Sequence, residues 1–177
     1  MREHHVVLTT LLLAAFPVLA DNESGPPHWS EVVGAATVID GDSLYIGDTE
    51  VRLYGVDAFE FEQTCAGEPC GAAAAQSLAD IAGRHPVRCV GIAGDSCGRL
   101  IAVCRTRGRD LGREQILAGL ALADRSMTDD YVTEEAEARA AVAGTWATDF
   151  ATPWDFRATL ATDLDRGCAI SRLESIP

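Results

Sequence analysis

The fold is decided by one stretch of this chain, Val51-Arg52-Leu53-Tyr54-Gly55-Val56-Asp57-Ala58-Phe59-Glu60. In its first half, apolar Val51 and Leu53 alternate with Arg52 and Tyr54, which predicts a β-strand with one buried face. The glycine and the aspartate that follow end the strand, and a short acidic segment comes next. We therefore expect a strand over residues 50–56 that carries charged side chains to its carboxyl end.

Strand and helix patterns continue on both sides of this stretch. Apolar, β-branched runs bounded by turn residues predict four more strands, at residues 32–39, 43–46, 87–92 and 100–105. Apolar residues at helical spacing predict three helices, at residues 71–81, 110–121 and 131–143. This succession indicates an α+β fold. We expect a five-stranded OB-type β-barrel with three α-helices, because a closed sheet leaves few exposed strand edges.

The amino-terminal segment predicts export. A short region with Arg2 precedes an apolar run at residues 6–18, and Val18-Leu19-Ala20 precedes polar residues, as at a signal-peptide cleavage site. The run is too short to span a bilayer, which needs roughly 20 apolar residues. An uncleaved anchor is the alternative. We expect a periplasmic or secreted protein without a membrane anchor, divided into a signal peptide (1–20), a polar lead-in (21–31), the OB-fold domain (32–157) and a carboxyl-terminal tail (158–177).

Six cysteines follow the predicted signal peptide. An even number of cysteines in an exported chain points to disulfides. Two of them close a tight loop, two more lie almost symmetrically about a Gly-rich turn at residues 94–98, and two are left over. We therefore expect the pairs Cys65–Cys70, Cys89–Cys104 and Cys97–Cys168. For the third pair, two unrelated thiols are the alternative.

Carboxylates gather around the predicted strand ends. Asp40 and Asp42 flank a glycine, and Asp57 and Glu60 follow the quoted strand. Hard carboxylate oxygens of this kind suit Ca²⁺ or Mg²⁺. An Asp-Gly-Asp sequence by itself is more often an ordinary turn, so the argument for a site needs further residues.

Two arginines supply them. Arg52 lies on the strand that leads to Asp57, and Arg99 closes the turn before the fifth strand. A guanidinium group matches two phosphate oxygens, a metal ion and arginines together neutralise charge on a reacting phosphate, and a spare carboxylate can orient or deprotonate water. These residue types therefore point to a phosphodiesterase. The formal net charge of −13 argues against general binding of phosphate backbones, so nucleic-acid binding must depend on local arginines.

Four motifs in order resemble the staphylococcal nuclease (thermonuclease) family: Val-Ile-Asp-Gly-Asp-Ser at 38–43, the stretch at 51–60, Gly-Arg-Leu-Ile-Ala at 98–102 and Gly-Leu-Ala at 119–121. The resemblance covers residues 34–147 and implies an OB barrel with three helices. It also implies Ca²⁺-dependent hydrolysis of nucleic acid by a monomer, with single-stranded DNA or RNA as substrate. Position by position, it implies direct Ca²⁺ carboxylates at Asp42 and Asp57, a backbone carbonyl ligand at Ala58, a second-sphere acid at Asp40, a general base at Glu60, and phosphate-binding arginines at Arg52 and Arg99.

Three departures from the family pattern concern the substrate cleft. Phe59 replaces a proline between the metal aspartate and the glutamate, Ser96-Cys97 replaces a Lys-Tyr pair, and Asp124 stands near a base-stacking tyrosine. Since aromatic stacking contributes roughly 1–3 kcal/mol per base in single-strand binders, these departures predict weak substrate binding. A family member that has lost nuclease activity and serves in the cell envelope, as in exopolysaccharide (succinoglycan) gene clusters, is the alternative. The complete set of charged residues favours the enzyme.

Overall fold

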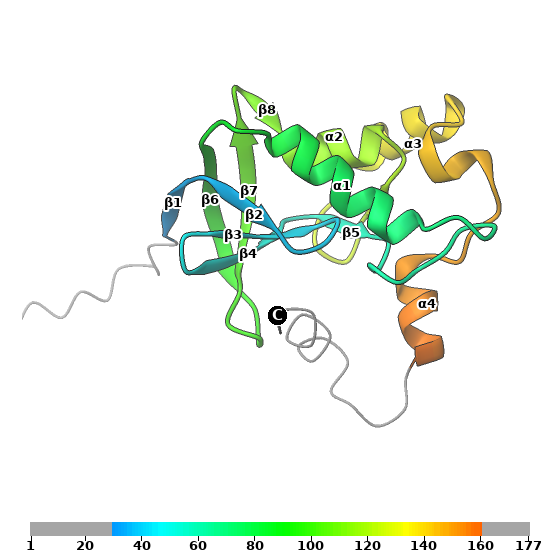
Figure 1. Cartoon of the computed structure of the whole chain (residues 1–177), viewed down its shortest axis with the longest axis horizontal. Helices are drawn as coiled ribbons and strands as arrows, with labels where there is room; N and C mark the ends of the chain where they lie inside the picture. The colour runs from blue at the N-terminus through cyan, green and yellow to red at the C-terminus, as the bar shows by residue number, and fades with distance from the viewer. Residues whose placement is uncertain (1–29, 161–177) are drawn as a thin grey trace, which may run out of the picture.

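The structure, a computed structural model, describes residues 30–160. Its elements in chain order are β1 (Glu31–Gly34), β2 (Ala36–Val38), β3 (Ser43–Ile46), β4 (Thr49–Leu53), β5 (Val56–Ala58), α1 (Cys70–Ala82), β6 (Val87–Gly94), β7 (Leu100–Thr106), β8 (Arg109–Asp110), α2 (Leu111–Leu117), β9 (Ala121–Ala123), α3 (Val132–Ala140), the 3₁₀ helix η1 (Gly144–Ala147) and α4 (Pro153–Leu160). Figure 1 shows a curled sheet with α1 and α2 beside it, and α4, in orange, on the opposite side of the view from β1 and β6.

The main sheet curls back towards its own beginning. Its strands follow the order β1-β6-β7-β4-β3-β2, and β8 adds to β7. The strands at the two ends of this order, β1 and β2, are separated in the chain by Ala35 alone. The single strand predicted at 32–39 is therefore bent, since β1 pairs with β6 and β2 pairs with β3. The predicted α+β class and the OB-type sheet are confirmed.

A small second sheet corrects two predicted boundaries. The strand predicted at 50–56 ends at Leu53, because Gly55 takes a positive φ of 71° and the chain turns before β5. The helix predicted at 110–121 ends at Leu117, because Gly119 also takes a positive φ, of 68°. Residues 121–123 then form β9, which pairs with β5. The apolar spacing that suggested a longer helix suits this buried strand equally well.

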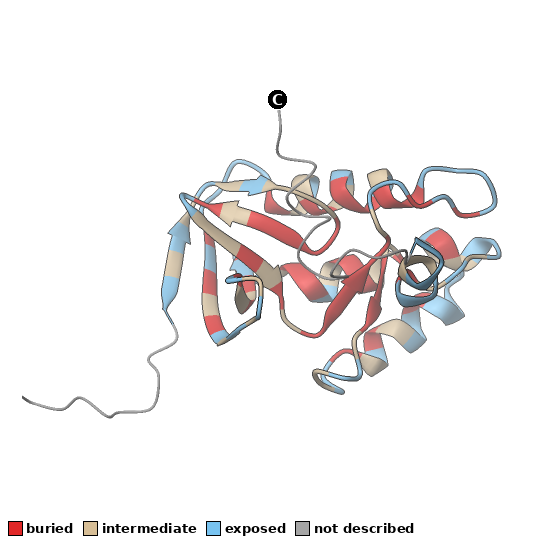
Figure 2. Cartoon of the chain, turned by 90° about the horizontal axis from the view of Figure 1, so that it is seen from below, coloured by how far each residue is buried: buried red, intermediate tan, exposed pale blue. Residues whose placement is uncertain are grey.

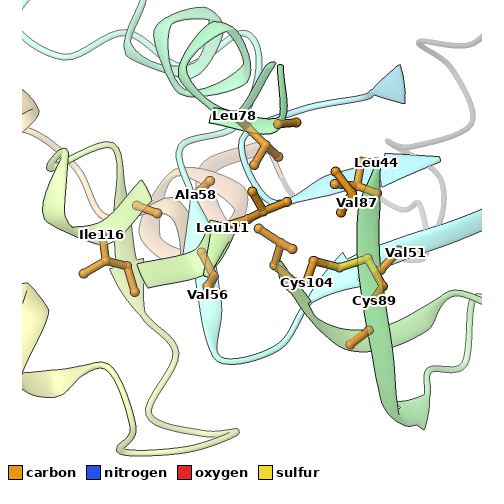
Figure 3. Packing of buried hydrophobic residues seen from close by; sticks show 14 of the residues in the cluster. Leu44, Val51, Val56, Ala58, Leu78, Val87, Cys89, Cys104, Leu111 and Ile116 are labelled. Atoms are coloured by element: carbon orange, nitrogen blue, oxygen red, sulfur yellow. A yellow bond between two sulfur atoms is a disulfide. The ribbon is translucent and has the colours of Figure 1, made fainter. Parts of the chain in front are cut away.

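The hydrophobic core lies between the main sheet and α1 and α2. Figure 2 shows that buried positions line β3, β4 and β5 and the inner sides of the helices. Figure 3 shows the Cys89–Cys104 disulfide packed inside this core, among Leu44, Val51 and Val87. Full burial of one such aliphatic side chain stabilises the fold by about 1.5–3 kcal/mol. The core therefore holds rigidly the strand ends at which the charged residues lie.

Two of the three predicted disulfides lie within the described residues, and both are formed: Cys65–Cys70 and Cys89–Cys104. The third predicted pair includes Cys168, which lies outside the described residues, so that pair stays a prediction. Disulfides of this kind point to an oxidising compartment outside the cytoplasm. Within residues 30–160, no helix is both long enough and apolar enough to cross a membrane.

The helix α4 was not among the three helices predicted from the sequence. Thr152 Oγ1 donates to Asp155 Oδ2 (2.7 Å) and accepts from the Asp155 backbone N–H (3.2 Å). The second bond is an N-cap contact, from the N–H of the third helical residue to a threonine side chain, and Pro153 occupies the first helical position, where proline fits well. The helix includes residues on both sides of 157/158, the predicted boundary between domain and tail.

Candidate active site

The turn Asp40-Gly41-Asp42 is fixed between β5 and α1. A Cβ atom on Gly41 would lie 2.6 Å from the Ala58 Cβ and 2.7 Å from the Ala74 Cβ, so only glycine allows this approach. The fully buried Gln115 donates from Nε2 to the carbonyl oxygens of Gly41 (2.8 Å) and Ala74 (2.9 Å). The turn thereby directs its aspartates towards the end of β5.

Asp42 makes three side-chain hydrogen bonds in the site. Its side chain is buried; Oδ2 accepts from the Ala58 N–H (2.9 Å), and Oδ1 accepts from Ser43 Oγ (2.9 Å) and from Arg52 Nη1 (3.3 Å). Asp40 stands behind it and accepts from the Asp42 N–H through Oδ1 (3.0 Å). The two aspartates of the predicted turn therefore contact each other, and Asp42 also bonds to Arg52.

Arg52 connects Asp42 to Asp57. Besides Asp42, its guanidinium donates from Nη2 to the Val56 carbonyl oxygen (3.3 Å) and to Asp57 Oδ1 (3.4 Å). Asp57 is as buried as Asp42. The pairing of β3 with β4, which sets Ser43 opposite Arg52, brings the arginine to this position.

Glu60 lies on a tight turn against the start of α1. The Glu60 carbonyl oxygen accepts from the Gln63 N–H (2.7 Å), and the Glu60 N–H donates to Gln63 Oε1 (3.2 Å). A Cβ atom on Gly71 would lie 1.6 Å from the Glu60 carbonyl oxygen, so a larger residue there would displace the turn. The Cys65–Cys70 disulfide closes the loop that connects this turn to α1.

Arg157 of α4 was missed by the sequence prediction and completes the cluster. Its guanidinium binds Asp57 at both oxygens, with Nη1–Oδ1 at 2.8 Å and Nη2–Oδ2 at 2.7 Å. Nη1 also donates to Glu60 Oε1 at 2.6 Å. The capping signal at residues 152–155 would have revealed the helix. The pairing of Arg157 with an aspartate 100 positions earlier has no local signal.

Arg99 lies apart from this cluster. Its Nε donates to Asp95 Oδ2 (2.7 Å), and no other ion pair joins it to the described residues. Because β7 runs parallel to β4 with Ile101 opposite Arg52, Arg99 and Arg52 project from the same face of the sheet, two positions out of step. Five of the six predicted side chains are thus brought together, namely Asp40, Asp42, Arg52, Asp57 and Glu60. Arg99 lies outside this set, immediately before the neighbouring strand β7.

The cluster carries more negative than positive charge, with four carboxylates around two guanidinium groups. Burial raises the pKa of Asp42 to about 6; the charge of Arg52 opposes this shift, and Asp40 and Asp57 add to it. Burial also raises the pKa of Glu60, against the hydrogen bond from Arg157, which lowers it. Removing carboxylates from water and placing them together favours a bound cation.

These residues fit Ca²⁺ in donor type and in charge. Buried carboxylate oxygens and the Ala58 carbonyl are the ligands that this ion takes. Among residues 30–160, however, no group of three or more acidic, histidine or cysteine side chains is arranged around a common point as metal ligands. Instead, the Arg157 guanidinium supplies positive charge at Asp57 and Glu60.

A groove of about 880 Å³ is lined in part by Asp57 and Arg157. Aromatic and cationic side chains contribute to its walls, among them Trp146, Trp154, Arg125 and Arg139. Arg139 lies over the Trp146 ring, 4.8 Å from its centroid. Aromatic surface is therefore present beside the site, although it comes from a later segment than the one in which the sequence suggested a loss.

The comparisons with known proteins agree with this geometry. The family described as Staphylococcal nuclease homologue matches residues 50–148, which include Arg52, Asp57, Glu60 and Arg99. Asp40 and Asp42 precede the matched residues, and α4 with Arg157 follows them. The chain is 34% identical over 145 residues to the "Succinoglycan biosynthesis protein ExoI" of Rhizobium meliloti (strain 1021), covering 76% of this chain and 73% of that protein. The chain therefore belongs to the family of staphylococcal nuclease homologues.

Proposed function

We propose that this protein is a Ca²⁺-dependent nuclease that hydrolyses nucleic-acid phosphodiester bonds. One observation carries the proposal: Asp42, Arg52, Asp57 and Glu60 come from separate elements and form one linked cluster, of which Asp57 also lines a groove. A binding module has no need for buried carboxylates, a bridging arginine and a further carboxylate in one place. A hydrolase that must neutralise and attack a phosphate needs all of them.

Each side chain has a role in this proposal. Arg52 and Arg99 hold the phosphate, Arg99 through the Nη groups that its bond to Asp95 leaves unused. Glu60 takes the proton of the water that adds to phosphorus. One ester P–O bond breaks, and its oxygen leaves with the bonding electrons and takes up a proton from solvent. A pKa raised by burial makes this carboxylate a stronger base. Asp42, Asp57 and the Ala58 carbonyl would hold Ca²⁺, with Asp40 behind them, and the ion supplies charge neutralisation when bound.

The proposed substrate is single-stranded DNA or RNA, bound weakly by a monomer. The aromatic wall of the groove suits unstacked bases. The net charge of −13 opposes long-range attraction of any polyanion. We further propose that residues 1–20 direct export and are removed, so that the protein acts in the periplasm or outside the cell without an anchor.

A non-hydrolytic role in the cell envelope is the second candidate. The name of the relative in Rhizobium meliloti assigns that protein to succinoglycan biosynthesis. The acidic charge of this chain and Asp124 near the usual stacking position also favour this role. It predicts no Ca²⁺-dependent cleavage.

Cleavage of single-stranded DNA and RNA by the purified protein separates the two candidates. The assay uses excess Ca²⁺, with and without a chelator, and compares the wild type with Glu60→Gln, which keeps the shape of the side chain and removes the base. We expect Ca²⁺-dependent cleavage that falls about a hundredfold or more in the variant, the usual contribution of a general base.

Glu62→Gln is the matched control, because Glu62 lies two positions further on and is exposed. We expect it to cleave like the wild type. If the wild type shows no cleavage above the level with chelator, the nuclease proposal fails and the envelope role is favoured. If both variants lose activity equally, Glu60 is not the base.

A further inference from the structure

We propose that α4 is a built-in inhibitor whose Arg157 competes with the divalent cation for Asp57 and Glu60. The inference rests on the proposed function, because it concerns the same cation site. Arg157 binds both oxygens of Asp57 and one of Glu60 at 2.6–2.8 Å. A carboxylate held in this way cannot turn the same lone pairs to a metal ion, and Glu60 cannot take a proton from water through the bonded oxygen.

The segment before α4 is anchored so that the helix starts beside the site. The Phe150 ring packs edge-on against Phe59, with centroids 5.2 Å apart, and also against Trp146 at 5.1 Å. The buried Gln63 donates from Nε2 to the Ala151 carbonyl oxygen at 2.7 Å. The next residue caps α4. Phe59 and Gln63 flank Glu60 in sequence, so the loop that carries the proposed base also holds the inhibitory segment.

This contact with Phe150 explains why a phenylalanine stands at position 59. It stands where the family carries a proline, and it is 1% exposed, in a cluster with Cys65 and Cys70 against which Phe150 packs. The residues matched by the family end at 148, just before Phe150. The phenylalanine that replaces the family's proline thus packs against a residue that follows the part of the chain matched by the family.

The helix itself is attached weakly beyond this anchor. Pro153 is its only buried residue, and Trp154 and Leu160 are 45% and 51% exposed. Arg157 is therefore the main link between the rest of α4 and the domain. A segment with so little buried surface opens locally at low cost in free energy. Release of α4 exposes the two carboxylates and leaves the barrel and the anchor intact.

Calorimetric titration of the full chain with CaCl₂ tests the competition without any cleavage assay. If Arg157 occupies the site about nine-tenths of the time or more, its removal tightens Ca²⁺ binding at least about tenfold. We expect Arg157→Gln to show this gain. Arg157→Lys keeps one charge and loses the two-pronged contact, so we expect an affinity between the two. Hydrogen exchange supplies a second readout, because Ca²⁺ should speed exchange at residues 154–160 of the wild type.

Arg109→Gln is the matched control, since Arg109 forms an exposed ion pair with Glu114 away from the site. Its affinity should equal that of the wild type. Equal Ca²⁺ affinity in the wild type and in Arg157→Gln overturns the inference, and so does the absence of binding in both. Tighter binding in Arg157→Gln without cleavage sustains the inference and defeats the nuclease proposal. Cleavage by the wild type together with equal Ca²⁺ affinities sustains the nuclease proposal and overturns the inference.

Discussion

Two Arg–Asp pairs in this molecule have the same shortest nitrogen–oxygen distance and different origins. Arg99 and Asp95 are four positions apart in the turn between β6 and β7, and Arg157 and Asp57 are 100 positions apart. Both pairs have a nitrogen–oxygen distance of 2.7 Å. The first is made by five consecutive residues, whereas the second needs β5, the Glu60 turn and α4 in their final places. The first pair therefore depends on one turn, whereas the second pair depends on the structure of the whole site.

A substitution near the Arg157–Asp57 pair should therefore affect several parts of the site. A substitution near the Arg99–Asp95 pair should affect only its own turn. Asp57 shares Arg52 with Asp42 and shares Arg157 with Glu60. Among residues 30–160, in contrast, Asp95 binds only within its own turn: besides the Arg99 side chain, its Oδ1 accepts from the N–H groups of Cys97 and Arg99, each at 2.9 Å. Three substitutions test this difference, in decreasing order of expected effect.

The largest effect is expected for Phe59→Ala, which removes the anchor of the long-range pair. Loss of a fully buried phenylalanine ring costs about 3–5 kcal/mol, because a cavity remains where Phe59 packs against Phe150. We expect this loss in the free energy of unfolding, measured by urea denaturation. Phe61→Ala is the control, since Phe61 is 45% exposed, and should change stability by less than about 0.5 kcal/mol. Equal losses in the two variants would contradict the anchoring role.

A smaller effect is expected for Arg52→Met, which keeps the side-chain length and removes the charge between Asp42 and Asp57. Two buried carboxylates then face each other, and breaking a buried pair costs about 3 kcal/mol. We expect Ca²⁺ to restore part of this loss, because the ion supplies the missing charge. Urea denaturation with and without Ca²⁺ measures both. Arg109→Met, at an exposed ion pair, should change stability little with or without the ion.

The sequence predicts the local features of this fold and misses those made by distant contacts. The strands at 43–46, 87–92 and 100–105 and the helix at 71–81 lie close to their expected bounds, because alternation and helical spacing are local signals. The bend at Ala35 and the pairing of β9 with β5 depend on partners elsewhere in the chain. Apolar residues alone do not distinguish β9 from a last helical turn.

The same division holds for the site. Asp40, Asp42, Arg52, Asp57 and Glu60 were expected together because they lie at strand ends that meet, and the structure places them in one cluster. Their metal and catalytic roles stay predictions. Arg157 was not expected, because its partners are about 100 positions away and no local signal links them. Arg99 was grouped with the cluster, but the structure pairs it with Asp95, a residue that the sequence assigned only to a turn.

The smallest effect is expected for Asp95→Asn in the local pair. The amide oxygen can still accept from the backbone N–H groups, so the loss is confined to the charge facing Arg99 and is about 1 kcal/mol or less. Burial raises the pKa of Asp95, but the hydrogen bonds and charge of Arg99 outweigh it and hold this pKa below its usual value. A carboxyl of this kind contributes stability that is complete above the pKa of the unfolded chain and is lost as the pH falls through the folded value. Urea denaturation at several pH values should therefore show the full difference between wild type and variant at neutral pH and a decreasing one below about pH 4. A difference that persists unchanged in acid would mean that Asp95 acts through its shape and not its charge, and Arg99 would then be held by the turn alone.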